Sequence, residues 1–202
     1  MNLREHLEKG FWEYLEENED IEIYNEFSLQ HELGIYLRDN FNDCHVQFER
    51  NIDYFDEYLI NEEPVKKEID IVIFNKDKSS CHAIEIKYPQ NKRYPLTMYD
   101  CIKDIKFMEQ LKTAGFESTF CITIVNRNDD NKSYLFYKGN HKKGIYKYFR
   151  SGQPIDEPVA IPVGNKKGKE HIKLNYPNYK IDWNDDYINR DWMKYIIETK
   201  KI

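Results

Sequence analysis

Three charged side chains, Asp70, Glu85 and Lys87, have the types and spacing needed to hold a metal ion, a water molecule or a phosphate group. Asp70 lies in a stretch rich in β-branched residues at 68–74, and the other two end a similar stretch at 83–87. The residues between these stretches have turn composition, which predicts two antiparallel strands joined by a loop. Because side chains alternate between the faces of a strand, Glu85 and Lys87 then share one face.

The register of this hairpin decides whether the acids meet. If Phe74 pairs with Cys81, Asp70 falls opposite Glu85 with the two Cβ atoms about 5 Å apart. Two carboxylates at that distance repel by roughly 3 kcal/mol at an effective dielectric near 20. Mg²⁺ or Mn²⁺ would compensate, because these ions bind one or two carboxylates and take their other ligands from water or phosphate. The alternative is an exposed strand face that carries mixed charge, with Lys87 as part of it.

Asp70 followed by the triplet Glu85-Ile86-Lys87 resembles the PD-(D/E)XK nucleases, the restriction-endonuclease-like superfamily. Ile69 stands where the motif's name has proline, a position at which members vary. The resemblance implies an α/β fold with a mixed sheet, in the order helix, three antiparallel strands, helix, strand. It also implies that Asp70, Glu85 and the main-chain carbonyl of Ile86 hold Mg²⁺ or Mn²⁺, while Lys87 orients the attacking water.

The first helix of such a core is predicted to start at Ser28, a residue type that caps helices well. An apolar stripe at helical spacing follows it: Leu29, Leu33, Tyr36 and Leu37. Glu32 lies on the border of this stripe. Many members of the superfamily carry a glutamate on this helix that joins the metal site, and Glu32 matches it by position. An ordinary exposed glutamate is the alternative.

The remaining core elements follow from hydrophobic periodicity. The predicted elements are a strand at 45–52, a helix at 97–114 ended by Gly115, a strand at 118–125 and a neighbouring strand at 132–138. The charged residues of the helix, among them Asp104 and Lys106, are expected to form intrahelical pairs in solvent. The core then spans about 27–138.

Both ends of the chain are predicted to be additions to this core within a single domain, 1–202. An amphipathic helix is expected at 2–18, weakened by Gly10. The prolines of the extension 139–202 predict an irregular or edge-strand region, followed by a final helix capped by Asn184. The inward residues of that helix would be Ile188, Trp192, Tyr195 and Ile196. These ends could pack on the core or form a contact in a homodimer or with a protein partner.

Charge bears on the kind of partner. The formal net charge is −6, whereas contacts with nucleic-acid phosphates usually leave a basic surface. Two basic stretches within 138–169 nevertheless contain aromatic residues or glycines and could neutralise phosphates and stack unpaired bases. Solvated loops have the same composition. The candidate nucleic-acid contacts are Lys142, Lys143, Lys147, Arg150, Lys166 and Lys167.

Other classes of protein are disfavoured. The cysteines show no CxxC pair and the histidines no ligand spacing, which argues against a zinc site. With no signal peptide before them, the cysteines are expected to be reduced thiols in a cytoplasmic protein. No apolar run approaches the ~20 residues that span a membrane. No glycine-rich phosphate loop is present, which disfavours nucleotide-driven chemistry.

The leading hypothesis is a metal-dependent nuclease that hydrolyses phosphodiester bonds, with DNA as the expected substrate and RNA as the alternative. The second is a catalytically silent nuclease-like domain that binds nucleic acid or protein in a defence or mobile-element system. The acidic balance and the lack of a helix-turn-helix pattern favour the second, and the presence of Asp70, Glu85 and Lys87 together favours the first. A third class, a structural interaction protein, requires that their spacing be coincidental.

Overall fold

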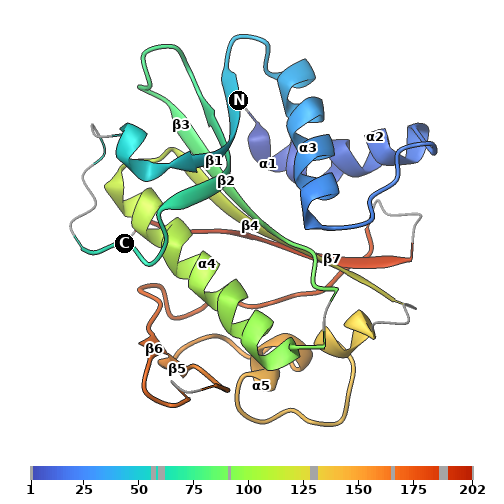
Figure 1. The fold of residues 1–202 in the computed structure, drawn as a ribbon, viewed down its shortest axis with the longest axis vertical. Helices are drawn as coiled ribbons and strands as arrows, with labels where there is room; N and C mark the ends of the chain where they lie inside the picture. The colour runs from blue at the N-terminus through green and yellow to red at the C-terminus, as the bar shows by residue number, and fades with distance from the viewer. Residues whose placement is uncertain are drawn as a thin grey trace.

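A mixed five-stranded sheet forms the centre of the molecule (Figure 1). The computed structural model describes residues 2–55, 58, 62–90, 92–127, 132–164, 167–186 and 191–201. The strands, in their order across the sheet, are β1 (His45–Asn51), β2 (Glu68–Phe74), β3 (Cys81–Lys87), β4 (Ser118–Asn126) and β7 (Trp192–Glu198). Only the β3–β4 pair is parallel among them. The chain therefore has an α/β fold, as predicted.

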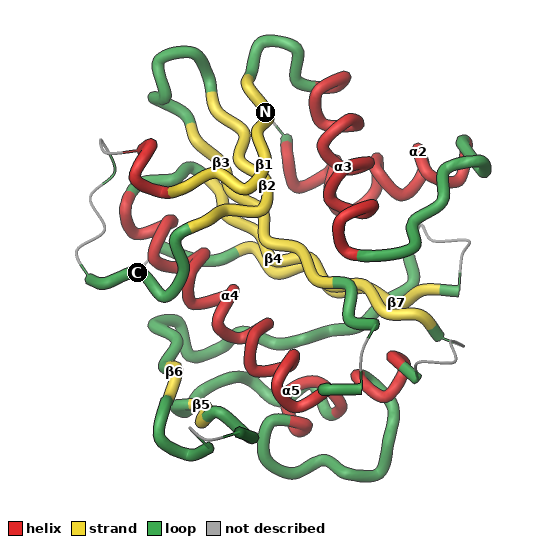
Figure 2. The backbone as a smooth tube through the Cα atoms, in the orientation of Figure 1, coloured by secondary structure: helices red, strands yellow, loops and turns green. Residues whose placement is uncertain are grey.

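Helices cover both faces of the sheet (Figure 2). They are α1 (Leu3–Glu5), α2 (Phe11–Glu17), α3 (Glu26–Asn40), α4 (Tyr94–Ala114) and α5 (Tyr146–Arg150). The first three pack on the face that presents Ile84 and Ile86 of β3, whereas α4 and α5 pack on the face that presents Cys81 and Ala83. Strand alternation thus divides the apolar side chains into two cores.

The N-terminal segment is helical where a helix was predicted, with a π-helical turn, His6–Gly10, between α1 and α2. At Gly10 a Cβ atom would clash with the hydroxyl of Tyr36, so this residue allows α3 to approach closely. The helix α3 begins one turn earlier than predicted, because Asn25 is its N-cap and Ser28 forms the other half of a capping box.

The hairpin of β2 and β3 has the predicted register. Phe74 pairs with Cys81, and the ladder runs inward to the pair of Ile71 and Ile84. The predicted strands at 45–52 and 118–125 and the helix at 97–114 correspond to β1, β4 and α4. The turn residues between the hairpin strands include Lys78, which takes a positive φ of 59°.

The predicted strand at 132–138 is wrong. Residues Ser133–Phe136 form a 3₁₀-helix instead, after Lys132 in a left-handed conformation. Ser133 and Phe136, three residues apart, are the buried pair, as expected where a 3₁₀ turn places i and i+3 on one side. The Phe136 ring packs against the rings of Tyr94 and Phe149, so the aromatic residue that suggested a strand instead anchors this turn on α4.

The predicted C-terminal helix is also wrong. Residues 192–198 form β7, which pairs antiparallel with β4, and Asn184 makes a β-bridge to Lys194 instead of capping a helix. Without β7, the open edge of the buried strand β4 would expose unpaired backbone groups. Trp192, Lys194, Tyr195 and Ile197 are buried in this strand, whereas Ile188 lies outside the described residues.

The free energy of unfolding should depend on pH through Lys194 on β7. Its ammonium lies 4.8 Å from the centre of the Trp12 ring and donates to the carbonyl of Asp186. Burial lowers the pKa of Lys194 to about 8, although Asp186 opposes the shift. The unfolded lysine binds a proton near pH 10.4 and the folded one only below about 8, so folding becomes more favourable as pH rises between these values.

We expect Lys194→Met to raise the free energy of unfolding at pH 7 by roughly 2 kcal/mol. The gain should shrink toward pH 10.5, because the folded wild-type lysine is then neutral and the unfolded one has lost about half of its charge. Urea denaturation of both proteins at pH 7, 8.5 and 10 measures it. A difference that stays constant across these pH values would contradict the assignment.

Candidate functional site

The candidate site forms where the ladder between β2 and β3 ends. Beyond Ile71 and Ile84, side chains replace the backbone partners. The Ile86 N–H donates to Oδ2 of Asp70 at 2.8 Å, and the Asp70 N–H donates to Oε1 of Glu85 at 3.4 Å. The two carboxylates therefore meet as the register predicted, and both are held by the strands that carry them.

A lysine that the sequence did not single out lies between these acids. The Lys66 ammonium donates to Oε2 of Glu85, lies 3.1 Å from Oδ1 of Asp104 on α4, and lies 4.0 Å from Oδ1 of Asp70. The Glu85 side chain is 1% exposed and that of Asp104 is 5% exposed. Asp104 was expected in solvent, so its burial on the face that covers β3 corrects that prediction.

Lys87 completes the cluster at the end of β3. Its ammonium donates to the Ile86 carbonyl at 2.9 Å and lies 3.3 Å from Oδ2 of Asp104 and 3.4 Å from Oε1 of Glu26. Glu26 also accepts the Tyr88 N–H at 3.0 Å, which ties the first turn of α3 to the strand. The carbonyl that the resemblance assigns to a metal is thus bonded to Lys87.

Glu32 is not brought to this cluster. Its carboxylate lies 3.4 Å from Nδ1 of His31 and contributes, after burial, to a raised Tyr14 pKa. No contact joins it to Asp70, Glu85 or Lys87 within the described part of the chain. The physical reason is helix periodicity, because Glu26 and Gln30 share the side of α3 that reaches the cluster, whereas Glu32 lies about 200° around the helix from Gln30.

The helix α3 contributes two other residues. One is Glu26, which pairs with Lys87, and the other is Gln30, whose amide donates to the Asp70 carbonyl at 2.6 Å and to Oε1 of Glu49 at 2.8 Å. Glu26 was missed because the helix was expected to begin at Ser28. Its place in the first turn, once Asn25 is recognised as the cap, is the signal that could have found it. No pattern in the irregular segment before β2 marked Lys66.

The cluster has an excess of negative charge. Four carboxylates face two ammonium groups, the residues being Glu26, Asp70, Glu85, Asp104, Lys66 and Lys87. Burial raises the pKa of Asp70 to about 6, against the opposing effect of the two lysines. Burial, then Asp104 and Asp70, raise the pKa of Glu85 well above its ordinary range. Burial alone would lower the pKa of Lys66 and Lys87, but the carboxylates, Asp104 foremost, raise both.

The donor set fits a hard divalent cation, since carboxylate oxygens are the ligands that Mg²⁺ and Mn²⁺ prefer. The four carboxylates exceed the two ammonium groups by two negative charges, which one divalent cation would neutralise. Within the described residues, however, no group of three His, Cys, Asp or Glu side chains is arranged to hold a metal ion. The Lys66 ammonium lies among the oxygens that would have to converge. A metal held by Asp70, Glu85 and Asp104 would therefore have to displace Lys66.

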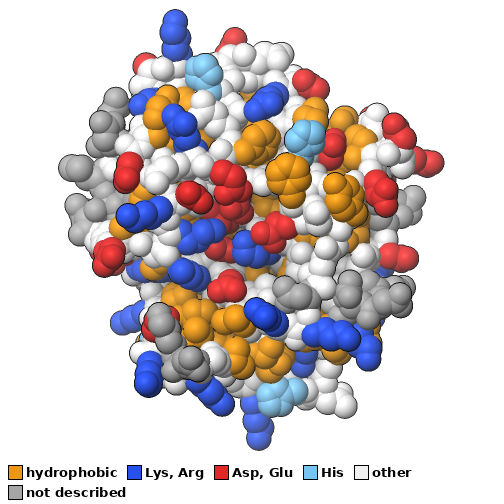
Figure 3. Space-filling view, in the orientation of Figure 1, with side chains coloured by type: hydrophobic (Ala, Val, Ile, Leu, Met, Phe, Trp, Pro, Cys, Tyr) orange, Lys and Arg blue, Asp and Glu red, His pale blue; other side chains and the backbone are white. Residues whose placement is uncertain are grey.

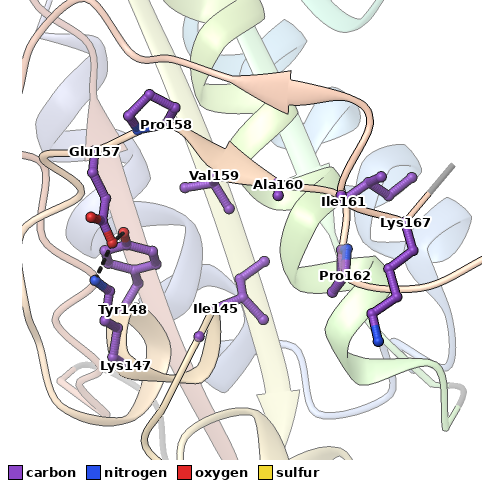
Figure 4. Close-up of a pocket in the computed structure, with 12 residues that line it drawn as sticks. Ile145, Lys147, Tyr148, Glu157, Pro158, Val159, Ala160, Ile161, Pro162 and Lys167 are labelled. Atoms are coloured by element: carbon purple, nitrogen blue, oxygen red, sulfur yellow. Dashed lines mark hydrogen bonds and ion pairs between the residues drawn. The ribbon is translucent and has the colours of Figure 1, made fainter.

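The predicted nucleic-acid contacts serve varied roles. Arg150 donates to the carbonyls of Leu135 and His141, which makes it part of the fold. Lys147 pairs with Glu157, and both line a groove of about 280 Å³ together with Lys167 (Figure 4). Lys142 and Lys143 are exposed, and Lys166 lies outside the described residues. Among the described residues, none of these basic side chains contacts Asp70, Glu85 or Lys87.

No helix among the described residues is both long and apolar enough to cross a membrane. Comparison of the chain with protein-family models, with curated proteins and with solved structures found no match in any of the three.

Proposed function

We propose that this protein is a Mg²⁺- or Mn²⁺-dependent phosphodiesterase that cleaves nucleic acid, with DNA as the expected substrate and RNA as the alternative. The observation that carries the proposal is the meeting of Asp70 and Glu85 with Lys87 at the end of one hairpin, in a cluster with more carboxylates than ammonium groups. The order α3, β1, β2, β3, α4, β4 agrees with the order that the resemblance to PD-(D/E)XK nucleases implies.

Asp70 and Glu85, with Asp104 in support, would hold the metal. A bound divalent ion lowers the pKa of a water molecule and neutralises charge that develops on a phosphate. Lys87 faces Asp104 and Glu26, and these carboxylates keep its side chain an ammonium. It therefore acts as a donor and a positive charge that orients water or phosphate, and not as a base.

The test is cleavage of supercoiled, linear and single-stranded DNA and of RNA with Mg²⁺ or Mn²⁺. We expect cutting by the wild-type protein and its loss in both Asp70→Asn and Lys87→Ala. Glu68→Gln is the matched control, since Glu68 is an exposed acid on the same strand as Asp70. Calorimetric titration with Mn²⁺ should show binding that Asp70→Asn abolishes. Wild-type protein that neither binds Mn²⁺ nor cuts would overturn the proposal.

The placement of Lys66 favours a second candidate function. An ammonium that satisfies Glu85 and Asp104 could make the cluster a permanent structural network. The domain would then be a catalytically silent binding module. Mn²⁺ affinity separates the two, because a permanent network leaves no place for the ion.

A further inference from the structure

Three aromatic residues, Tyr24, Phe27 and His31, precede and follow Glu26 of the candidate site in the chain, and we call them the aromatic patch. Tyr24 is 60% exposed and Phe27 is 67% exposed, the highest values among the large hydrophobic side chains of the described residues. The His31 ring stacks on Phe27 with an interplanar angle of 17° and a centroid separation of 6.2 Å. Rings left in water at this extent contribute little to the fold, so the patch offers faces for a ligand.

Hydrogen bonds tie this patch to the end of β3. Glu26 lies between the two aromatic residues in the chain and bonds the Tyr88 N–H while it pairs with Lys87. The Gln90 side chain donates to the Tyr24 carbonyl. Figure 3 shows acidic and basic side chains mixed at the centre of this face, with hydrophobic side chains beside them over α3. The patch is thus held next to the lysine that we propose contacts phosphate.

Two basic residues come shortly after Gln90, the residue bonded to Tyr24. Lys92 and Arg93 are exposed and stand two and three positions after it, so positive charge lies close in the chain to the contact that holds Tyr24. Rings together with cations are the combination by which proteins bind single-stranded nucleic acid, because every unpaired base has a face that can stack. In a duplex those faces are covered by neighbouring bases.

We propose that Phe27, with Tyr24 and His31, is a stacking surface for an unpaired base of the substrate, so that the protein prefers single-stranded nucleic acid, or strands with unpaired ends, over duplex. This inference rests on the proposed phosphodiesterase function for its substrate class. Phe27 is the main contact, because its ring is the most exposed of the three and already stacks on that of His31.

The test measures binding without cleavage, in EDTA, by fluorescence anisotropy of labelled single-stranded and duplex oligonucleotides. We expect Phe27→Ala and Phe27→Leu to weaken single-strand binding by about 5- to 100-fold, the effect of losing one base–aromatic stack. Duplex binding should change less. Phe27→Trp should restore single-strand affinity, and its indole fluorescence should be quenched by the single strand. Val163→Ala, at a 40% exposed apolar residue outside the patch, is the control.

Single-strand binding that is unchanged in Phe27→Ala would overturn the inference. So would full restoration by leucine, since this would indicate an apolar protein contact and not stacking. A failure of the nuclease proposal looks different, because Mn²⁺ binding and cutting would be absent while the quenching of Trp at position 27 by single strands stays measurable.

Discussion

Mn²⁺ should bind at least about 100-fold more tightly when Lys66 is replaced by methionine. The Lys66 ammonium lies among the oxygens of Asp70, Glu85 and Asp104, so it competes directly with a metal ion for them. A unit charge about 4 Å from another contributes about 4 kcal/mol at an effective dielectric near 20, which exceeds the 1.4 kcal/mol of a tenfold change in affinity. Isothermal titration calorimetry with Mn²⁺ measures the difference.

The same substitution should make stability depend on metal. Without Lys66, the buried carboxylates of Glu85 and Asp104 lose their nearest cation, and an uncompensated buried charge costs about 3–5 kcal/mol. Lys66→Met is therefore expected to unfold at lower urea concentration in EDTA and to recover on addition of Mn²⁺. If Lys66→Met is unfolded in EDTA, Mn²⁺ should induce its folding, and this would equally show that its stability depends on the metal.

Lys67→Met is the matched control, because Lys67 is the next residue and is exposed. It should leave both Mn²⁺ affinity and urea stability close to the wild-type values. Equal or weaker Mn²⁺ binding by Lys66→Met would show that the carboxylates do not exchange the ammonium for a metal. The cluster would then be a structural ion network.

The second large effect concerns Glu109, which joins α4 to the C-terminal extension. Its carboxylate is fully buried and accepts the N–H groups of Asn175, at 2.9 and 3.1 Å, and Tyr176, at 2.8 Å. Glu109→Ala removes these acceptors and leaves two backbone donors unpaired next to a cavity. We expect the free energy of unfolding to fall by about 2–4 kcal/mol.

Glu109→Gln distinguishes hydrogen bonding from charge. Glutamine keeps one acceptor oxygen, and burial already opposes the charged carboxylate by raising its pKa. The glutamine variant should therefore lose less stability than the alanine variant in urea denaturation at pH 7. Hydrogen exchange should locate the loss at 175–176. An alanine variant within about 0.5 kcal/mol of the wild-type protein would contradict this role.

Local patterns were sufficient for most of the core. β-branched composition beside a turn located β2, a short and nearly all-apolar run located β4, and an apolar stripe at helical spacing located α4, because each of these patterns lies within one segment. The turn between Phe74 and Cys81 determined the register, and the register determined that Asp70 meets Glu85. The turn and the two strands that it joins are close in sequence, so the length of the turn leaves few possible registers.

The errors occurred where distant segments decided the outcome. The apolar residues of 192–198 suit a helix stripe and a strand alike, and the open edge of β4 selects the strand. Ser133–Phe136 has strand composition but turns as a 3₁₀-helix to bury Phe136 against α4. In both segments a tertiary contact outweighs local propensity.

The same division applies to the candidate site. The sequence by itself determined the pair of acids and the lysine on one hairpin, because strand alternation and turn register are local properties. Only the tertiary structure placed Lys66 and Asp104 beside them, paired Glu26 with Lys87 and left Glu32 in contact with His31. Helix packing sets which face of a sheet each side chain reaches, and nothing within a single segment encodes that choice.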